Sequence, residues 1–149
     1  MNNKTLWIVR GLAGSGKTTV ANLLVSGLQA SPEIISADDY FYSDGEYKFD
    51  PTKLGEAHQR CKDYVGSAMF FGEPNIIVHN TFSQRWEFEP YEKLAKANRY
   101  TVFIIECQND FGSEHDVPRE TITRMSERWE PLKDDEGMAA WKRYEDDLG

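Results

Sequence analysis

Eight consecutive residues constrain this chain more than any others: Gly11-Leu12-Ala13-Gly14-Ser15-Gly16-Lys17-Thr18. They fit the pattern G-x-x-x-x-G-K-[ST] completely, and each residue type in it has a physical task. Glycines let the backbone turn tightly, so that its N–H groups point inward at a phosphate. Lys17 reaches the β- and γ-phosphates, and the Thr18 hydroxyl is offered to Mg²⁺. The pattern predicts a P-loop, or Walker A motif, with ATP and Mg²⁺ as cofactors. The predicted nucleotide-binding residues are Gly11, Ala13, Gly14, Ser15, Gly16, Lys17, Thr18 and Thr19.

The residues around this pattern favour the same interpretation. Leu6-Trp7-Ile8-Val9 precedes the glycines as a buried strand would, and apolar residues at helical spacing follow them. These are Val20, Ala21, Leu24, Val25 and Leu28. A strand, a glycine-rich loop and a helix in this order place a helix N-terminus under the anion, where helices bind phosphate.

The remaining elements alternate in the same way. The apolar and β-branched runs predict strands over Leu6–Val9, Glu33–Ser36, Asn75–Val78 and Thr101–Ile105. Helices are predicted over Leu54–Phe71, from Gln84 through Ala95, from Pro118 through Trp129 and, more weakly, over Met138–Leu148. Alternation of this kind predicts a three-layer α/β P-loop NTPase fold in which helices cover both faces of a parallel sheet of about four to five strands. We expect one domain over residues 1–149.

Composition narrows the range of partners. The net charge is −8, the wrong sign for a protein that grips long nucleic acid through its phosphates. No apolar run approaches the length of a membrane span, and no signal peptide is recognised, so a cytoplasmic location without membrane contact is expected. Cys61 and Cys107 lie in apolar periodic segments and are interpreted as small buried side chains.

A family resemblance rests on motifs that follow the P-loop in a fixed order. They are Ile35-Ser36-Ala37-Asp38-Asp39-Tyr40-Phe41, Tyr47-Lys48-Phe49-Asp50-Pro51, Leu54-Gly55-Glu56-Ala57-His58, Ile76-Ile77-Val78-His79-Asn80-Thr81, Pro90-Tyr91 and Val117-Pro118-Arg119-Glu120-Thr121-Ile122. With these motifs the chain resembles the polynucleotide-kinase-like P-loop kinases. That family includes the 5′-kinase domain of phage polynucleotide kinase, and the chain is closer still to the P-loop domains of NEDD-binding proteins. The resemblance covers about residues 6–129.

The resemblance implies a role for Asp38. In the family, the first Asp of the D-D-Y element takes the proton from the attacking hydroxyl. A carboxylate at the carboxyl end of the second strand can orient such a hydroxyl toward the γ-phosphate and can reach Mg²⁺ through water. The alternative is a helix-capping or turn role, which is the stronger interpretation for Asp39. Tyr40, Phe41 and Tyr42 follow in a segment interpreted as a long loop, where they would stack a base or cover the site.

Two departures from the family pattern concern charge. His79 stands where closer relatives carry an Asp, so metal binding is assigned to Thr18, Asp38, waters and the nucleotide. The family also carries a lid Arg before the Val-Pro element, whereas residues 106–116 contain neither Arg nor Lys. Arg119 and Arg124 are the nearest cations that follow, and Arg119 is the preferred candidate because it lies in the first helical turn.

These observations predict an ATP-dependent kinase that transfers the γ-phosphoryl group to a hydroxyl. Its catalytic residues would be Lys17, Asp38 and Arg119. The expected acceptor is the 5′-hydroxyl of a nucleic acid or nucleotide. A small-molecule kinase and a non-catalytic nucleotide-binding protein with a protein partner stay open as alternatives.

Overall fold

A parallel sheet of four strands forms the centre of the molecule. The computed structural model describes residues 3–28, 31–108 and 117–132. The strands are β1 (Thr5–Gly11), β2 (Glu33–Ile35), β5 (Asn75–Asn80) and β6 (Thr101–Cys107), in the spatial order β2-β5-β1-β6. All four predicted strands are therefore confirmed. Because β1 lies between β5 and β6, the loop that follows it emerges in the middle of the sheet edge.

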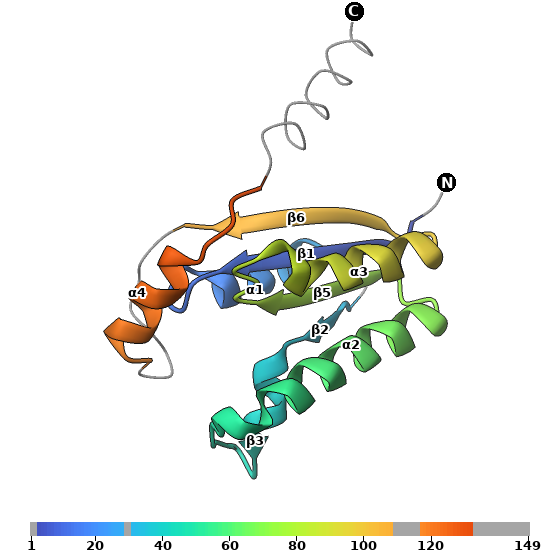
Figure 1. Cartoon of the computed structure of the whole chain (residues 1–149). Coiled ribbons are helices and arrows are strands. Elements are labelled where there is room, and N and C mark those ends of the chain that lie inside the picture. The colour runs from blue at the N-terminus through green and yellow to red at the C-terminus, as the bar shows by residue number, and fades with distance from the viewer. Residues whose placement is uncertain (1–2, 29–30, 109–116, 133–149) are drawn as a thin grey trace, which may run out of the picture.

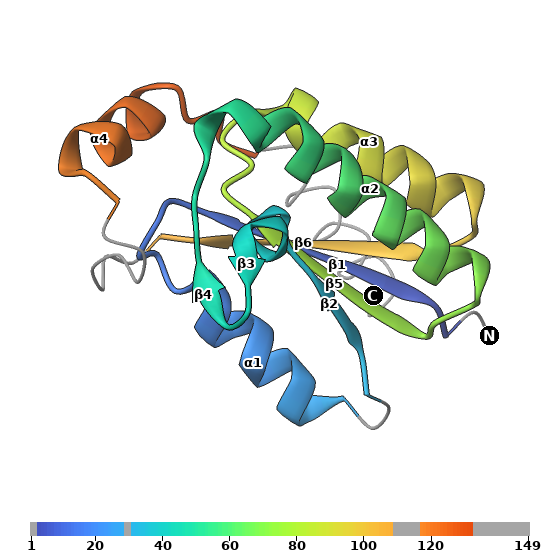
Figure 2. The same ribbon diagram turned by 90° about the horizontal axis from the view of Figure 1, so that it is seen from below.

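Helices cover both faces of this sheet, as predicted. Helix α1 (Lys17–Gly27) lies on one face, and α2 (Leu54–Phe70) and α3 (Arg85–Ala97) lie on the other (Figures 1 and 2). The side chains of β1 point to opposite faces of the sheet. Leu6 and Ile8 pack with α2 and α3, whereas Val9 packs with Ala21 of α1. The strands are apolar on both sides because both sides are covered.

A fourth helix, α4 (Arg119–Glu127), lies at the end of the molecule toward which the parallel strands point (Figure 1). Its existence is confirmed, although Trp129 lies just beyond its end. The helix predicted over Met138–Leu148 lies outside the described residues. None of the helices that the structure describes is long and apolar enough to cross a membrane.

The segment from Tyr40 to Asp50, which was interpreted as a long loop, is instead structured. It contains the end of a 3₁₀ helix, Ala37–Phe41, and a two-stranded hairpin of β3 (Tyr42–Ser43) and β4 (Glu46–Tyr47). A second 3₁₀ turn, Pro51–Lys53, leads into α2. The hairpin turn is Asp44-Gly45, with φ 51° and 80°, and positive φ at both positions is what a two-residue type I′ turn requires.

Two aromatic side chains differ sharply in exposure. Trp86 is 67% exposed. It lies off the buried stripe of α3, which consists of Phe88, Tyr91 and Ala95. Phe41 was expected over the site, but only 4% of it is exposed. Of the two cysteines, both free, Cys61 is buried as predicted and Cys107 is partly buried.

Candidate active site

The loop between β1 and α1 has the backbone that a phosphate cradle needs. Gly14 and Gly16 adopt φ 80° and 103°, the left-handed region that side-chain-bearing residues rarely occupy. Gly16 is also the N-cap of α1. The unpaired N–H groups and the positive end of the helix dipole therefore face the loop.

Lys17 bends back over this loop. Its Nζ donates hydrogen bonds to the carbonyl oxygens of Gly11 and Leu12, at 2.8 and 2.9 Å. The ammonium group is thus held above the strand end by the loop itself. An anion bound within the loop would therefore lie beside the positive charge of Lys17, which the loop carbonyls already position.

The residues present fit a bound phosphate group. Ser15 is only 3% exposed, and its Oγ has no hydrogen-bond partner among the residues that the structure describes. A phosphate oxygen would supply that partner. A Cβ on Gly11 would clash with this Oγ and would lie 2.9 Å from the backbone carbonyl oxygen of Cys107, so a side chain here would force the loop or β6 to shift. Thr18 and Thr19 are exposed in the first turn of α1, where Thr18 can meet a metal ion.

Next to this loop, a polar turn joins β2 to the short helix that carries Asp38. Ser36 caps that helix, and Asp39 accepts a hydrogen bond from the Ser36 backbone N–H at 3.0 Å. Asp39 thus makes the capping contact expected of it. The amide oxygen of Asn80, at the end of β5, accepts a hydrogen bond from the N–H of Ala37 at 2.8 Å. This bond ties the turn to the neighbouring strand, and sequence reasoning assigned Asn80 no such role.

Asp38 is exposed at this turn, one residue before the capping carboxylate. Its backbone N–H donates to the Ser36 hydroxyl at 3.1 Å, which fixes the main chain while the side chain extends outward. Its Oδ1 accepts a hydrogen bond from the phenol of Tyr47 at 3.3 Å. The carboxylate is therefore oriented by a neighbour and accessible to solvent.

His79 connects the two parts of the site. It lies near the end of β5, in register with Val9 of β1, and is partly buried. Burial lowers the pKa of the imidazole, and Asp39, Lys17 and Asp38 all act on it through their charges. The P-loop lysine and the acidic turn therefore share one sheet edge, with a His79 that favours its neutral form between them.

The predicted lid cations lie on α4. Arg119 occupies its first turn and Arg124 its last, and both side chains are exposed. The helix stands at the carboxyl end of the strands, which is the end that carries the P-loop (Figure 1). Residues 109–116, which form most of the segment without Arg or Lys, lie outside the described residues.

No group of three or more His, Cys, Asp or Glu side chains poised to hold a metal ion occurs in the described ranges. A magnesium ion at this edge would therefore rely on oxygen atoms of the nucleotide, besides Thr18 and Asp38.

Sequence reasoning missed Arg10, the residue directly before the P-loop. It is fully buried, and its Cζ lies 4.0 Å from the ring centre of Trp129 and 4.8 Å from that of Phe88. Nη1 pairs with Glu106 Oε1 of β6 at 2.9 Å. Nη2 donates to the carbonyl oxygens of Phe82, Ser83 and Glu130, at 2.8, 3.2 and 2.8 Å. The only sequence signal for it was a charge inside an otherwise apolar strand.

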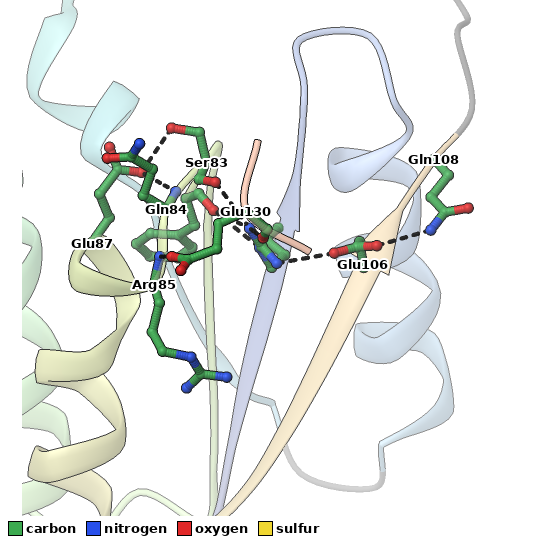
Figure 3. A network of polar contacts seen from close by, with 9 residues as sticks. Ser83, Gln84, Arg85, Glu87, Glu106, Gln108 and Glu130 are labelled. Atoms are coloured by element: carbon green, nitrogen blue, oxygen red, sulfur yellow. Dashed lines mark hydrogen bonds and ion pairs between the residues drawn. The ribbon is translucent and has the colours of Figure 1, made fainter. Parts of the chain in front are cut away.

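Further contacts extend this network to the segment after α4 (Figure 3). The N–H of Glu130 donates to the Ser83 carbonyl at 2.7 Å, and its carboxylate accepts from the Arg85 N–H at 2.6 Å. Glu106 also accepts from Gln108 at 2.8 Å. The network thus fastens the chain after α4 to the start of α3 and to β6, beside the P-loop.

The model of the AAA_33 family, described as an AAA domain, matches residues 6–132. Among curated proteins, human NEDD4-binding protein 2 is 37% identical over 134 residues, which cover 84% of this chain and 8% of that protein. The chain thus spans less than a tenth of the length of this relative.

Two solved structures show the same fold. A sugar kinase from Janibacter sp. HTCC2649 superposes with a TM-score of 0.60 at 15% identity, over 89% of this chain and 81% of that one. A chain of the Pnkp1/Rnl/Hen1 complex superposes with a TM-score of 0.57 at 17% identity, over 81% of this chain and 38% of that one. The predicted fold class is confirmed: the chain has a three-layer α/β, P-loop kinase-like fold.

Proposed function

This chain belongs to the AAA_33 family of AAA domains, and from that premise we propose that it is a single P-loop kinase domain that transfers the γ-phosphoryl group of ATP to a hydroxyl. One observation carries the proposal: an exposed, oriented carboxylate shares a sheet edge with the P-loop lysine. Asp38 and Lys17 both act electrostatically on His79. A phosphoryl acceptor and a phosphoryl donor can therefore meet at this edge.

The P-loop would hold the triphosphate. Backbone N–H groups from Gly14 to Thr18 surround the β-phosphate, and Lys17 exchanges its two carbonyl partners for phosphate oxygens. The Ser15 hydroxyl, which lacks a partner among the described residues, gains one. Thr18 would hold Mg²⁺, with Asp38 reaching the ion through water, and the ion when bound would offset the negative charge of the phosphates.

Asp38 would act on the acceptor. It accepts the proton of the acceptor hydroxyl while a bond forms between that oxygen and the γ-phosphorus, and the bond from the γ-phosphorus to the β–γ bridging oxygen breaks to leave ADP. Arg119 would supply positive charge to the transferring group from α4. The structure describes this helix at the carboxyl end of the strands, where such a charge is needed (Figure 1).

The first candidate acceptor is the 5′-hydroxyl of a nucleic acid or nucleotide. The resemblance to polynucleotide-kinase-like proteins supports it, as does the fold shared with a chain of the Pnkp1/Rnl/Hen1 complex. A net charge of −8 favours a short strand, a strand end or a nucleotide over a long polynucleotide.

Two other functions are each favoured by one observation. The net negative charge favours a kinase with a small-molecule acceptor over one that binds a polyanion, and a sugar kinase shares the fold. The absence of Arg and Lys from residues 106–116 suits a nucleotide-binding protein that transfers slowly or not at all and acts through a protein partner.

A transfer assay separates these functions. Labelled γ-phosphate of Mg·ATP is offered to a panel of 5′-hydroxyl oligonucleotides, nucleosides and sugars. The proposal expects the label on an oligonucleotide or nucleotide, and rates on long strands should fall steeply with salt. Label on a sugar alone identifies a small-molecule kinase. ATP binding without label on any acceptor contradicts a kinase function.

A further inference from the structure

The β3–β4 hairpin carries Tyr47, whose phenol contacts Asp38, the proposed general base. Tyr42 pairs with Tyr47 across the hairpin, and the Asp44-Gly45 turn fixes their register. From β4, the Tyr47 hydroxyl donates to Asp38 Oδ1 at 3.3 Å. No described residue donates a side-chain hydrogen bond to the second carboxylate oxygen, Oδ2. The hairpin therefore occupies one oxygen and leaves the other to an incoming group.

Aromatic packing sets the direction of this phenol. The Tyr47 ring lies 5.3 Å from the ring of Tyr42, 6.3 Å from that of Phe41 and 6.5 Å from that of Phe49, measured between centroids. Phe41 is itself buried against the core. The Lys48 N–H donates to the Phe41 carbonyl at 2.8 Å, which joins the hairpin to the short helix that carries Asp38. The donor and the acceptor therefore lie on two elements that are joined by backbone and aromatic contacts.

We propose that Tyr47 is a positioning residue for phosphoryl transfer, acting through Asp38. This inference rests on the function proposed above. With Oδ1 held by the phenol, the carboxylate cannot rotate freely, and Oδ2 faces the acceptor hydroxyl in a fixed orientation. A fixed general base raises the rate of the transfer step rather than the affinity for ATP.

The phenol is the donor in this contact, because the Tyr47 hydroxyl donates to Asp38 Oδ1 and an ionised carboxylate can only accept. The proton of the acceptor hydroxyl therefore passes to Asp38.

Kinetics of Tyr47→Phe test the inference, with Mg·ATP and the panel acceptor that the wild type phosphorylates fastest. Loss of one fixed partner of the base should lower kcat about tenfold or more, with an unchanged KM for ATP. In an Asp38→Asn background the same substitution should cause no further loss, because its effect passes through Asp38. Tyr64→Phe, which removes an exposed hydroxyl of α2 that accepts from Arg60 at 2.8 Å, serves as the matched control and should leave kcat unchanged.

The outcomes are separable. An unchanged kcat in Tyr47→Phe, or an equal loss in both backgrounds, overturns the inference and leaves the kinase intact. Absence of transfer by the wild type overturns the proposed function and this role with it. The contact itself is read from the ¹³Cζ resonance of Tyr47 at neutral pH, identified by its loss in Tyr47→Phe. It should move in Asp38→Asn, and an unmoved resonance also overturns the inference.

Discussion

Replacing Arg10 by Met should destabilise the protein severely, because Arg10 holds four segments together. Met keeps much of the length and apolar contact of the side chain but removes every donor. The Glu106 carboxylate, whose side chain is 15% exposed, loses its cationic partner. The carbonyl oxygens of Phe82 and Glu130 lose the Arg10 donor, whereas that of Ser83 still accepts from the Glu130 N–H.

The magnitude follows from these losses. Breaking a buried ion pair by removing one partner costs about 3–5 kcal/mol, and the carbonyl oxygens left without a donor add to this cost. Since each kcal/mol shifts the Tm of a domain of this size by roughly 2–4 °C, the Tm should fall by about 6–20 °C. Glu106→Gln keeps an acceptor oxygen for Arg10 and should cost less, about 1–2 kcal/mol.

Urea unfolding followed by tryptophan fluorescence measures the free energy of unfolding. Arg85→Met is a matched control, because Arg85 also lies over the Phe88 ring, at 5.2 Å, but pairs with a partly exposed Glu92. That variant should lose about 1 kcal/mol or less. Hydrogen exchange adds a local readout, since the Glu130 N–H that donates to Ser83 should lose protection in Arg10→Met. A loss in Arg10→Met no larger than that in Arg85→Met would refute this reasoning.

Three further predictions concern the site. Asp38→Asn should keep ATP binding and slow transfer by ~10² or more, the range for a positioned base; transfer at the wild-type rate would make Asp38 a turn residue. Arg119→Gln should slow transfer by ~10³ with little effect on ATP binding, and Arg124→Gln should not; if neither variant slows transfer, the charge comes from a partner chain or the protein is not a kinase. Burial lowers the pKa of the His79 imidazole below its ordinary 6.5. As the pH falls, the imidazole therefore takes up a proton in the unfolded chain before it does so in the folded protein. The free energy of unfolding should then decrease below about pH 6.5, by at most about 1.4 kcal/mol per pH unit. Below about pH 6.5, the urea midpoint of His79→Gln should depend less on pH than that of the wild type. An identical pH dependence in the two proteins would show that His79 is not the group responsible.

The fold could be predicted because its signals are local. Each buried strand is a continuous apolar run, and the spacing of Ala57, Cys61 and Ala68 marks the buried stripe of α2. Glycines at positions 14 and 16 specify their own backbone conformation. The hairpin was missed because strands of two residues are too short to show a period of two, although Asp44-Gly45 was a readable turn signal.

Much of the candidate site depends on contacts that no local pattern records. Arg10 finds its partners 72, 96 and 120 residues further along the chain. Asn80 reaches Ala37 across 43 residues. Periodicity describes which face a residue occupies, whereas a buried charge or amide is placed by tertiary partners. Asp38 was predicted from its match to the D-D-Y element of the family that the chain resembles, whereas Tyr47 was not predicted because its contact with Asp38 depends on the hairpin.

The central claim is that the P-loop binds a nucleoside triphosphate through Lys17. Titration calorimetry with Mg·ATP on the wild type and on Lys17→Ala tests it most directly, with circular dichroism showing that both are folded. The Lys17 ammonium donates to carbonyl oxygens of the loop and the residue lies outside the core clusters, so the variant should stay folded. The wild type should bind ATP, and Lys17→Ala should lose most of this affinity. Equal affinity in the two proteins, or no binding by the wild type, would contradict it.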